Sequence, residues 1–305
     1  MKNFQNILLV IDTLEIDEDA LSKVKTVLKN TSAHLSVMIL EHEFSKNLKE
    51  FKSAYEKDMR EKLSAKLKDL GLSGDAPVIF ADKKPYFVHI IQHVIKKDID
   101  LVIKAAQALD KNHSKGFKSL DMSLLRKCPC PVWLCRDSKD DEKPEIITAI
   151  DPLSETPEGR DLSIKLLQYG DYLANILEGH NTVIACWECD YEGVLRHSPF
   201  MKMAEDQVDK IIYEAELGTK QALETLMKEA GIENTNAVVK RGKAEEIIPD
   251  YIDAHNINLA VMGTVARTGI PGFFIGNTAE NIMQNIACGM FAAKPNGFSS
   301  PVKAY

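Results

Sequence analysis

Short apolar runs alternate with longer amphipathic segments along the whole chain. In the N-terminal part, apolar and β-branched runs predict strands at residues 7–11, 35–40, 78–80, 101–104 and 132–135. Apolar residues at helical spacing predict helices at residues 19–30, 47–70, 86–97 and 120–127. Apolar strands that alternate with helices indicate a parallel sheet covered by helices on both faces.

Five stretches of the N-terminal half recur in the C-terminal half, in the same order, and two of them show the repeat clearly. NILLVID at residues 6–12 is repeated as EIITAID at residues 145–151. IDLVIKAAQ at residues 99–107 is repeated as INLAVMGTV at residues 257–265. The copies lie about half a chain apart, which is much longer than the period of a solenoid repeat. The chain therefore contains a duplicated domain.

The duplication predicts the domain organisation. We expect a first domain at residues 1–137 and a second at residues 144–305, joined by the polar stretch DSKDDEKP. The predicted fold class is α/β, with two tandem, doubly wound, mostly parallel five-stranded sheets flanked by helices. A chain of 305 residues is long enough for both domains to bury a core of their own.

Composition and charge exclude several classes of partner. The chain is 45% hydrophobic and 27% charged, as in ordinary globular proteins. A formal net charge of −7 argues against a nucleic-acid partner, which requires a basic face. No apolar run reaches the roughly 20 residues of a membrane helix, so we expect no membrane insertion. Six cysteines without an evident export signal favour reduced thiols and a cytoplasmic location.

The segment GTVARTGIPGFFIGNTAE at residues 263–280 follows the predicted fourth strand of the second domain. Ligands of open α/β sheets bind at the carboxyl ends of the strands, where this segment begins. Gly263 has no side chain, which would let a ligand approach its backbone closely. Arg267 could donate further hydrogen bonds to an anion. The segment matches neither the Walker pattern nor the Rossmann pattern.

A helix is expected to begin directly after this loop, over residues 278–287. We expect Asn277 to cap it and Glu280 to complete a capping box. The free N–H groups and the dipole at such a helix start favour an anion such as phosphate. The alternative is a loop with a structural role alone, in which Phe273 and Phe274 are buried.

The loop resembles the nucleotide loop of universal stress proteins, G-x2-G-x9-G-[S/T]. Gly263 fills the first glycine position and Gly276 the third. Ala266 replaces the second glycine, and Asn277 replaces the final Ser or Thr. Together with LLRKCPCPVW in the first domain and AAKPNGFSSPV near the C-terminus, the segment is similar to tandem, E-type members of that family. The resemblance covers essentially all 305 residues.

This resemblance implies an adenine nucleotide alpha hydrolase-like fold and a cytosolic stress-response protein whose second domain binds ATP, with Mg²⁺ as a further candidate. In ATP-binding members the acid after the first strand contacts the nucleoside. The implied site is Asp151, Met262, Gly263, Ala266, Arg267, Gly276, Asn277 and Thr278. The family also implies that the two domains pair through their final strands, with residues 132–134 beside residues 290–292.

The matching segment of the first domain, at residues 104–121, carries Gly116 alone where the second domain has four glycines. Without the other glycines this loop cannot bring its backbone amides close to phosphates in the same way. Asp12 keeps the acid after the first strand. We therefore expect the first domain to be a degenerate partner that binds no nucleotide.

Other functions stay open at this stage. The departures at Ala266 and Asn277 are compatible with a sensor or carrier of another phosphorylated or lipid-like ligand, or with a protein-interaction scaffold. No catalytic constellation is visible, although weak ATPase activity is left open. The pairs Cys186 with Cys189 and Cys128 with Cys130 lack the second ligand pair of a zinc site. A further association of two chains into a homodimer also stays open.

Overall fold

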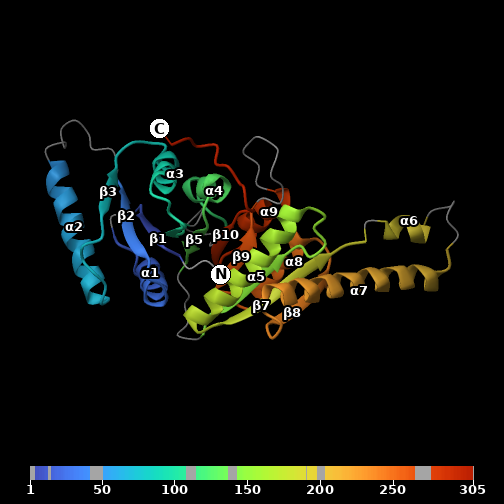
Figure 1. Ribbon diagram of the computed structural model, residues 1–305. Helices are drawn as coiled ribbons and strands as arrows, with labels where there is room; N and C mark the ends of the chain where they lie inside the picture. The colour runs from blue at the N-terminus through green and yellow to red at the C-terminus, as the bar shows by residue number, and fades with distance from the viewer. Residues whose placement is uncertain are drawn as a thin grey trace.

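The computed structural model describes residues 4–12, 15–41, 51–107, 115–136, 143–189, 191–197, 203–264 and 276–304. These residues form one ten-stranded sheet with helices on both faces (Figure 1). The strand order is β3-β2-β1-β4-β5-β10-β9-β6-β7-β8. The α/β class is confirmed, and the two expected five-stranded sheets are joined edge to edge into a single sheet.

The first half contains the five strands and four helices expected from the sequence. The strands are β1 (Asn6–Ile11), β2 (His34–Leu40), β3 (Val78–Ala81), β4 (Leu101–Ala105) and β5 (Val132–Cys135). The helices are α1 (Glu18–Asn30), α2 (Lys52–Asp69), α3 (Tyr86–Lys96) and α4 (Ser119–Lys127). The expected start of the second helix, at residue 47, lies outside the described residues.

The second half repeats this order and adds one short helix. Its strands are β6 (Glu145–Ile150), β7 (His180–Trp187), β8 (Asn236–Arg241), β9 (Leu259–Gly263) and β10 (Gly289–Ala293). Its helices are α5 (Pro157–Leu177), α6 (Glu192–His197), α7 (Glu205–Ala230), α8 (Ala244–Ala254) and α9 (Asn277–Asn285). The sequence pattern does not predict α6, which is only six residues long.

The two halves meet where β5 pairs with β10 in antiparallel register. Trp133 lies opposite Phe291, and Val132 lies opposite Ala292. This pairing confirms the expectation for the final strands. All other strand pairs are parallel, so the strands of one half run opposite to those of the other. The carboxyl ends of the two sets of strands therefore lie at opposite edges of the sheet.

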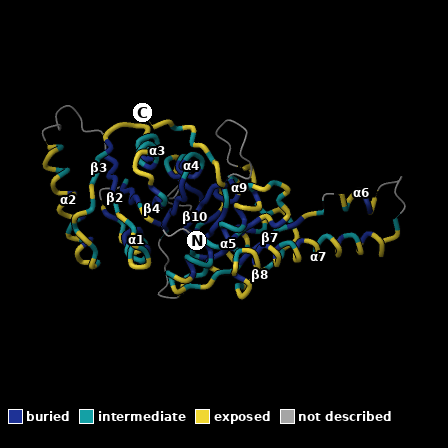
Figure 2. The backbone as a smooth tube through the Cα atoms, in the orientation of Figure 1, coloured by how far each residue is buried: buried dark blue, intermediate teal, exposed yellow. Residues whose placement is uncertain are grey.

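The core continues across this joint without a polar break (Figure 2). Trp133 and Phe291 are buried, and their rings meet edge to face at 6.2 Å between centroids. Tyr169 of α5 contacts Phe291 at 4.9 Å between centroids. Burial of large aromatic side chains contributes strongly to folding, so the joint is part of the core.

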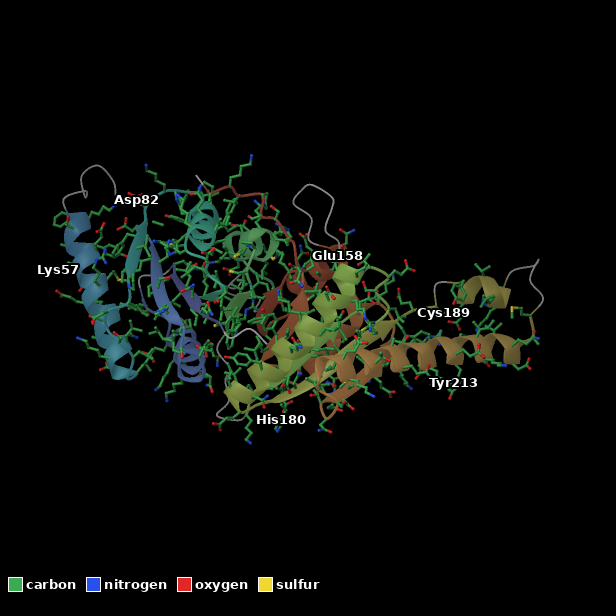
Figure 3. All side chains as sticks on the ribbon, viewed as in Figure 1. Lys57, Asp82, Glu158, His180, Cys189 and Tyr213 are labelled. Carbon is green, nitrogen blue, oxygen red and sulfur yellow. The ribbon has the colours of Figure 1, made fainter. Side chains whose placement is uncertain are left out.

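Helix α7 projects from the body of the second half together with α6 (Figure 1). At 26 residues it is about 39 Å long. A small apolar cluster of Trp187, Leu195, Val208 and Ile212 attaches α6 to α7 and β7. Tyr213, on the outer side of α7, is 64% exposed (Figure 3). Within the described ranges, no helix combines the length and the apolar character that crossing a membrane requires.

Candidate functional site

A large cavity lies at the carboxyl ends of the second-half strands. Its volume is about 1030 Å³. The walls come from the chain after β6, the start of α5, the ends of β7 and β9, the turn before α8 and the start of α9. Binding pockets for small molecules usually measure about 300–1,000 Å³. The cavity therefore lies where the sheet topology predicts a ligand and has room for a large one.

The cavity brings together most of the residues that the sequence singled out. Asp151, Met262, Gly263, Gly276 and Thr278 all line it. Asn277 is exposed at the first position of α9 and is not among the lining residues. The remaining two candidates, Ala266 and Arg267, lie outside the described residues, as do Phe273 and Phe274.

The start of α9 differs from the expected capping box. The N-cap is Gly276, with φ −62° and ψ 141°, and Asn277 is already helical. No described side chain accepts a hydrogen bond from the first turn. The carboxylate of Glu280 pairs instead with Arg126 of α4, so the prediction of a capping box was wrong. Because no side chain caps the turn, its N–H groups stay available to an anion.

Packing against α5 explains why a glycine is needed at position 263, whether or not a ligand also contacts it. A Cβ atom at this position would lie 2.7 Å from Cδ2 of Leu162 on α5. A methyl group cannot approach another carbon so closely without displacing it. Absence of a side chain at Gly263 therefore lets α5 pack closely on the end of β9. Both Gly263 and Leu162 also line the cavity.

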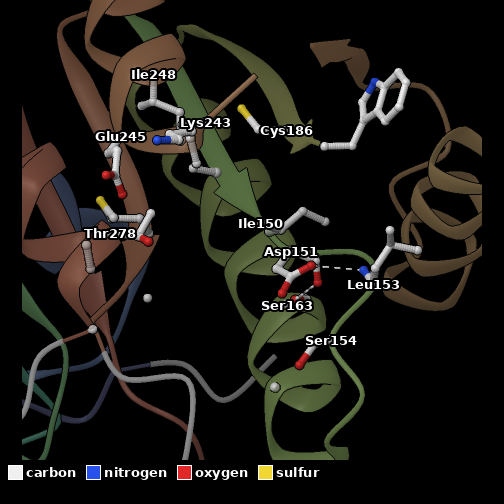
Figure 4. Close-up of a pocket in the computed structure, with 18 of the residues that line it drawn as sticks. Ile150, Asp151, Leu153, Ser154, Ser163, Cys186, Lys243, Glu245, Ile248 and Thr278 are labelled. Carbon is white, nitrogen blue, oxygen red and sulfur yellow. Dashed lines mark hydrogen bonds between the residues drawn. The ribbon is translucent and has the colours of Figure 1, made fainter. Parts of the chain in front are cut away.

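Asp151 faces the cavity from the end of β6. Its Oδ1 accepts a hydrogen bond from the backbone N–H of Leu153 at 3.0 Å, and its carbonyl accepts one from the Ser163 hydroxyl at 3.2 Å (Figure 4). These bonds fix the turn after β6 and hold the carboxylate at the cavity wall. An acid in this position can accept hydrogen bonds from sugar hydroxyls.

A second helix start, which the sequence reasoning missed, also borders the cavity. Lys243 is the N-cap of α8, and no described side chain caps that helix either. Gly242, with φ 130°, makes the turn between β8 and α8. Lys243 and Glu245 lie on the same side of the pocket as Thr278, across from Asp151 (Figure 4). The sequence does carry a signal for this helix start. Gly242 and Lys243 directly follow the strand, and Glu245 and Glu246 lie in the first turn of the helix.

The corresponding place in the first half is filled by the protein's own side chains. In the strand register, Lys104 of β4 lies opposite Val10 of β1, just as Met262 of β9 lies opposite Ala149 of β6. The Lys104 ammonium is fully buried and lies 2.7 Å from Oδ2 of Asp12 and 2.9 Å from Oδ1 of Asp121. Burial alone would lower the pKa of Lys104, but the two carboxylates outweigh it and raise the pKa.

Among the described residues, Asp12 of this buried triad of Lys104, Asp12 and Asp121 is also enclosed on its other side. A cavity next to Asp12 measures about 10 Å³. A single water needs at least about 10–15 Å³ of such space. The side chain of Gln107 also donates to Asp12, at 2.7 Å. The acid that corresponds to Asp151 is therefore engaged within the first half.

The cysteine pairs do not assemble into a metal centre within the part of the chain that the structure describes. There, no three His, Cys, Asp or Glu side chains are placed to hold a metal ion together. The Sγ atoms of Cys128 and Cys130 lie 3.6 Å apart as buried thiols. Buried free cysteines such as these two pack as small apolar residues.

Comparison with solved structures supports the architecture along the whole chain. A functionally unknown protein from Pseudomonas aeruginosa PAO1 superposes with a TM-score of 0.74, at 23% identity, over 96% of this chain and 93% of that one. A universal stress protein from Archaeoglobus fulgidus DSM 4304 superposes with a TM-score of 0.61, at 13% identity, over 94% of this chain and 98% of that one. At these identities the likeness concerns the fold.

Comparison of sequences identifies the family. Universal stress protein E of Photorhabdus laumondii is 29% identical over 100% of this chain and 99% of its own length. Universal stress protein E of Escherichia coli K12 is 28% identical over 99% of this chain and 98% of its own length. The model of the universal stress protein family matches twice, at residues 3–136 and 162–294. The chain therefore belongs to the universal stress protein family and carries two copies of its domain.

Proposed function

We propose that this protein is a cytoplasmic stress-response protein whose second half binds an adenine nucleotide, ATP, in the cavity described above. The observation that supports this most directly is the start of α9, which opens onto the cavity without a side-chain cap. Such a helix start offers N–H groups and a positive dipole end to phosphates.

The charges around the cavity suggest how ATP would be oriented. Thr278 and Lys243 lie on one side and Asp151 on the other (Figure 4). In the proposed arrangement, the phosphates contact the first turn of α9 and the ammonium of Lys243. The ribose hydroxyls donate to the Asp151 carboxylate at the opposite wall. Mg²⁺ bound with ATP would keep several waters and take one or two carboxylates, and Glu245 lies on the phosphate side.

The first half serves as a structural partner in this proposal. Its equivalent position is occupied by the Lys104 ammonium, which already neutralises Asp12 and Asp121. A nucleotide that used Asp12 as a partner would have to compete with these buried ion pairs, which is costly. One ATP per chain is therefore the expected stoichiometry.

Isothermal titration calorimetry with ATP, with and without Mg²⁺, tests the proposal. Thr278→Asp places a negative charge in the first turn of α9. The charge interacts favourably with the helix dipole but repels phosphate. We expect affinity to fall about tenfold or more. The matched control is Ser119→Asp, which adds the same charge to the exposed first position of α4 in the first half. Equal affinity for ATP in both variants would contradict the assignment of the site.

The size of the cavity favours a second candidate, a larger phosphorylated or lipid-like ligand. The volume of about 1030 Å³ is at the upper limit for small-molecule sites. Leu153 and Tyr191, each 53% exposed, give part of the cavity wall an apolar surface. Native mass spectrometry of freshly purified protein separates the candidates. A bound mass other than a nucleotide supports the second candidate. If no ligand is bound in the mass spectrum and calorimetry detects no heat of ATP binding, an interaction scaffold is supported instead.

A further inference from the structure

The end of α4 in the first half lies beside the start of α9 in the second half. This follows from the antiparallel joint, where Val132 at the start of β5 pairs with Ala292 near the end of β10. Helix α4 leads into β5, and α9 begins at the edge where β9 and β10 end. The anion-binding entrance, defined here as Thr264 and residues 276–279, is therefore next to the other half of the molecule.

Lys294 joins α4 to this entrance. It directly follows β10, is 4% exposed, and its ammonium donates to the carbonyl of Leu125 on α4. The same ammonium donates to the Thr264 hydroxyl at 2.7 Å. A buried ammonium requires such acceptors, and a helix carbonyl near the C-terminal end is a favourable one. Lys294 thus connects the first half to the residue that follows β9.

Thr264 in turn holds the two ends of the glycine-containing segment together. Its carbonyl accepts a hydrogen bond from the N–H of Gly276 at 3.1 Å. Gly276 is the N-cap of α9, so this bond sets where the helix starts relative to β9. A shift of Lys294 would therefore be passed through Thr264 to the amides that face the cavity.

A second contact joins the same end of α4 to the first turn of α9. Arg126, the neighbour of Leu125, forms an ion pair with the carboxylate of Glu280. The two side chains are about one-third exposed. Because the N–H of Glu280 donates to the Gly276 carbonyl at 2.9 Å, the ion pair also acts on the N-cap. Both ends of the entrance are thus held by consecutive residues of α4.

The equivalent position in the first half offers a matched comparison. Arg136 directly follows β5, as Lys294 follows β10. It donates to the carbonyl of Ile286 at the end of α9, at 3.0 Å, and to the carbonyl of Gly116 in the first-half loop. Each cation therefore links its own loop to the neighbouring helix of the other half. Arg136 reaches the far end of α9 and does not touch the entrance.

We propose that α4 of the first half positions the anion-binding entrance of the second half, with Lys294 and Arg126 as the positioning residues. The first half is then a working part of the ligand site, although it takes no nucleotide itself. The effect on affinity rests on the proposed function, because it requires that the entrance binds phosphate. The effect on the geometry of the entrance does not depend on any ligand.

The ligand-free test is amide hydrogen exchange at Gly276, measured by NMR in the full chain. Lys294→Met keeps the apolar stem but removes the ammonium, so we expect exchange at Gly276 to accelerate about tenfold or more. Arg136→Met removes the equivalent cation and should leave Gly276 within about twofold of the wild type. Unchanged exchange in Lys294→Met, or equal acceleration in both variants, would overturn the proposal.

The exposed contact gives a second test in case Lys294→Met folds poorly. Arg126→Gln should also accelerate exchange at Gly276, and Arg126→Lys should restore most of the protection because it keeps the charge. Calorimetry with ATP then separates the two proposals. If the wild type binds no ATP while the exchange pattern holds, the proposed function fails and the positioning role stands. If ATP binds with equal affinity to the wild type, Lys294→Met and Arg126→Gln, and exchange at Gly276 is also unchanged, the positioning role fails.

Discussion

The buried triad in the first half allows a sharp prediction for Lys104→Met. Methionine is the residue at the equivalent position of the second half, Met262, so the shape of the side chain suits the site. The substitution removes the ammonium from between Asp12 and Asp121, which it contacts at 2.7 Å and 2.9 Å. Both carboxylates then lose their buried counter-charge at once.

The expected loss of unfolding free energy follows from their burial. Loss of one partner from a buried ion pair costs about 3–5 kcal/mol, because the remaining charge is desolvated and unpaired. The side chain of Asp121 is only 1% exposed, whereas that of Asp12 is 10% exposed and also accepts from Gln107. Most of the penalty therefore falls on Asp121. We expect Lys104→Met to be destabilised by about 3–5 kcal/mol at pH 7.

A double variant isolates the cause. Lys104→Met with Asp121→Ala copies Met262 and Ala279 of the second half and removes the most deeply buried charge. We expect it to lie within about 1–2 kcal/mol of the wild type, because apolar replacement of a buried pair is often nearly neutral and the remaining Asp12 is 10% exposed and accepts from Gln107. The cost of the single variant should also shrink as the pH falls from 7 to 5, since Asp121 can then take up a proton.

Urea denaturation followed by tryptophan fluorescence measures these differences. The chain has two tryptophans, Trp133 in the first half and Trp187 in the second, so both halves report on unfolding. The reasoning would be refuted by a single variant within about 1 kcal/mol of the wild type. A double variant less stable than the single one would refute it as well, since the unpaired carboxylate would then not be the cause.

Two further predictions concern the joint and the buried lysine. Phe291→Ala should cost about 3–5 kcal/mol by urea denaturation, because Phe291 contacts Trp133 and Tyr169 in the core, and a cost below about 1 kcal/mol would contradict that packing. Burial lowers the pKa of Lys294 to about 8, so between pH 8 and about 10.4 the unfolded chain binds more protons than the folded one. The stability of the wild type relative to Lys294→Met should therefore rise over this range, by up to about 3 kcal/mol, and a flat difference in denaturation series would contradict it.

The overall architecture was largely predictable because it depends on patterns that repeat along the chain. The runs of apolar residues locate β1 to β5 within one or two residues, and the internal duplication predicts the second set. The pairing of β5 with β10 was predicted from the family resemblance. The pattern of a strand that is apolar on both faces does not indicate which strand lies beside it in the sheet. Helix α6 was missed because six residues carry too little periodicity.

The candidate site was predictable in its location and less so in its chemistry. Strand topology places Asp151 and Thr278 at one cavity from sequence alone. The capping box failed because Glu280 has a partner, Arg126, that is 154 positions away in the chain. Lys104 could have been noticed as a lysine inside an apolar strand, which requires a buried counter-charge. Only the folded structure identifies Asp12 and Asp121 as its partners.

The antiparallel seam between β5 and β10 has a consequence for how such a molecule can diversify. In a dimer of identical single-domain chains, every substitution occurs twice, and both copies of a site gain or lose a function together. Fusion of the two copies removes that constraint, so one copy can fill its own site with Lys104 while the other keeps an open one. The ion pair of Arg126 with Glu280 depends on the same independence of the two copies, because Arg126 belongs to the first copy and Glu280 to the second.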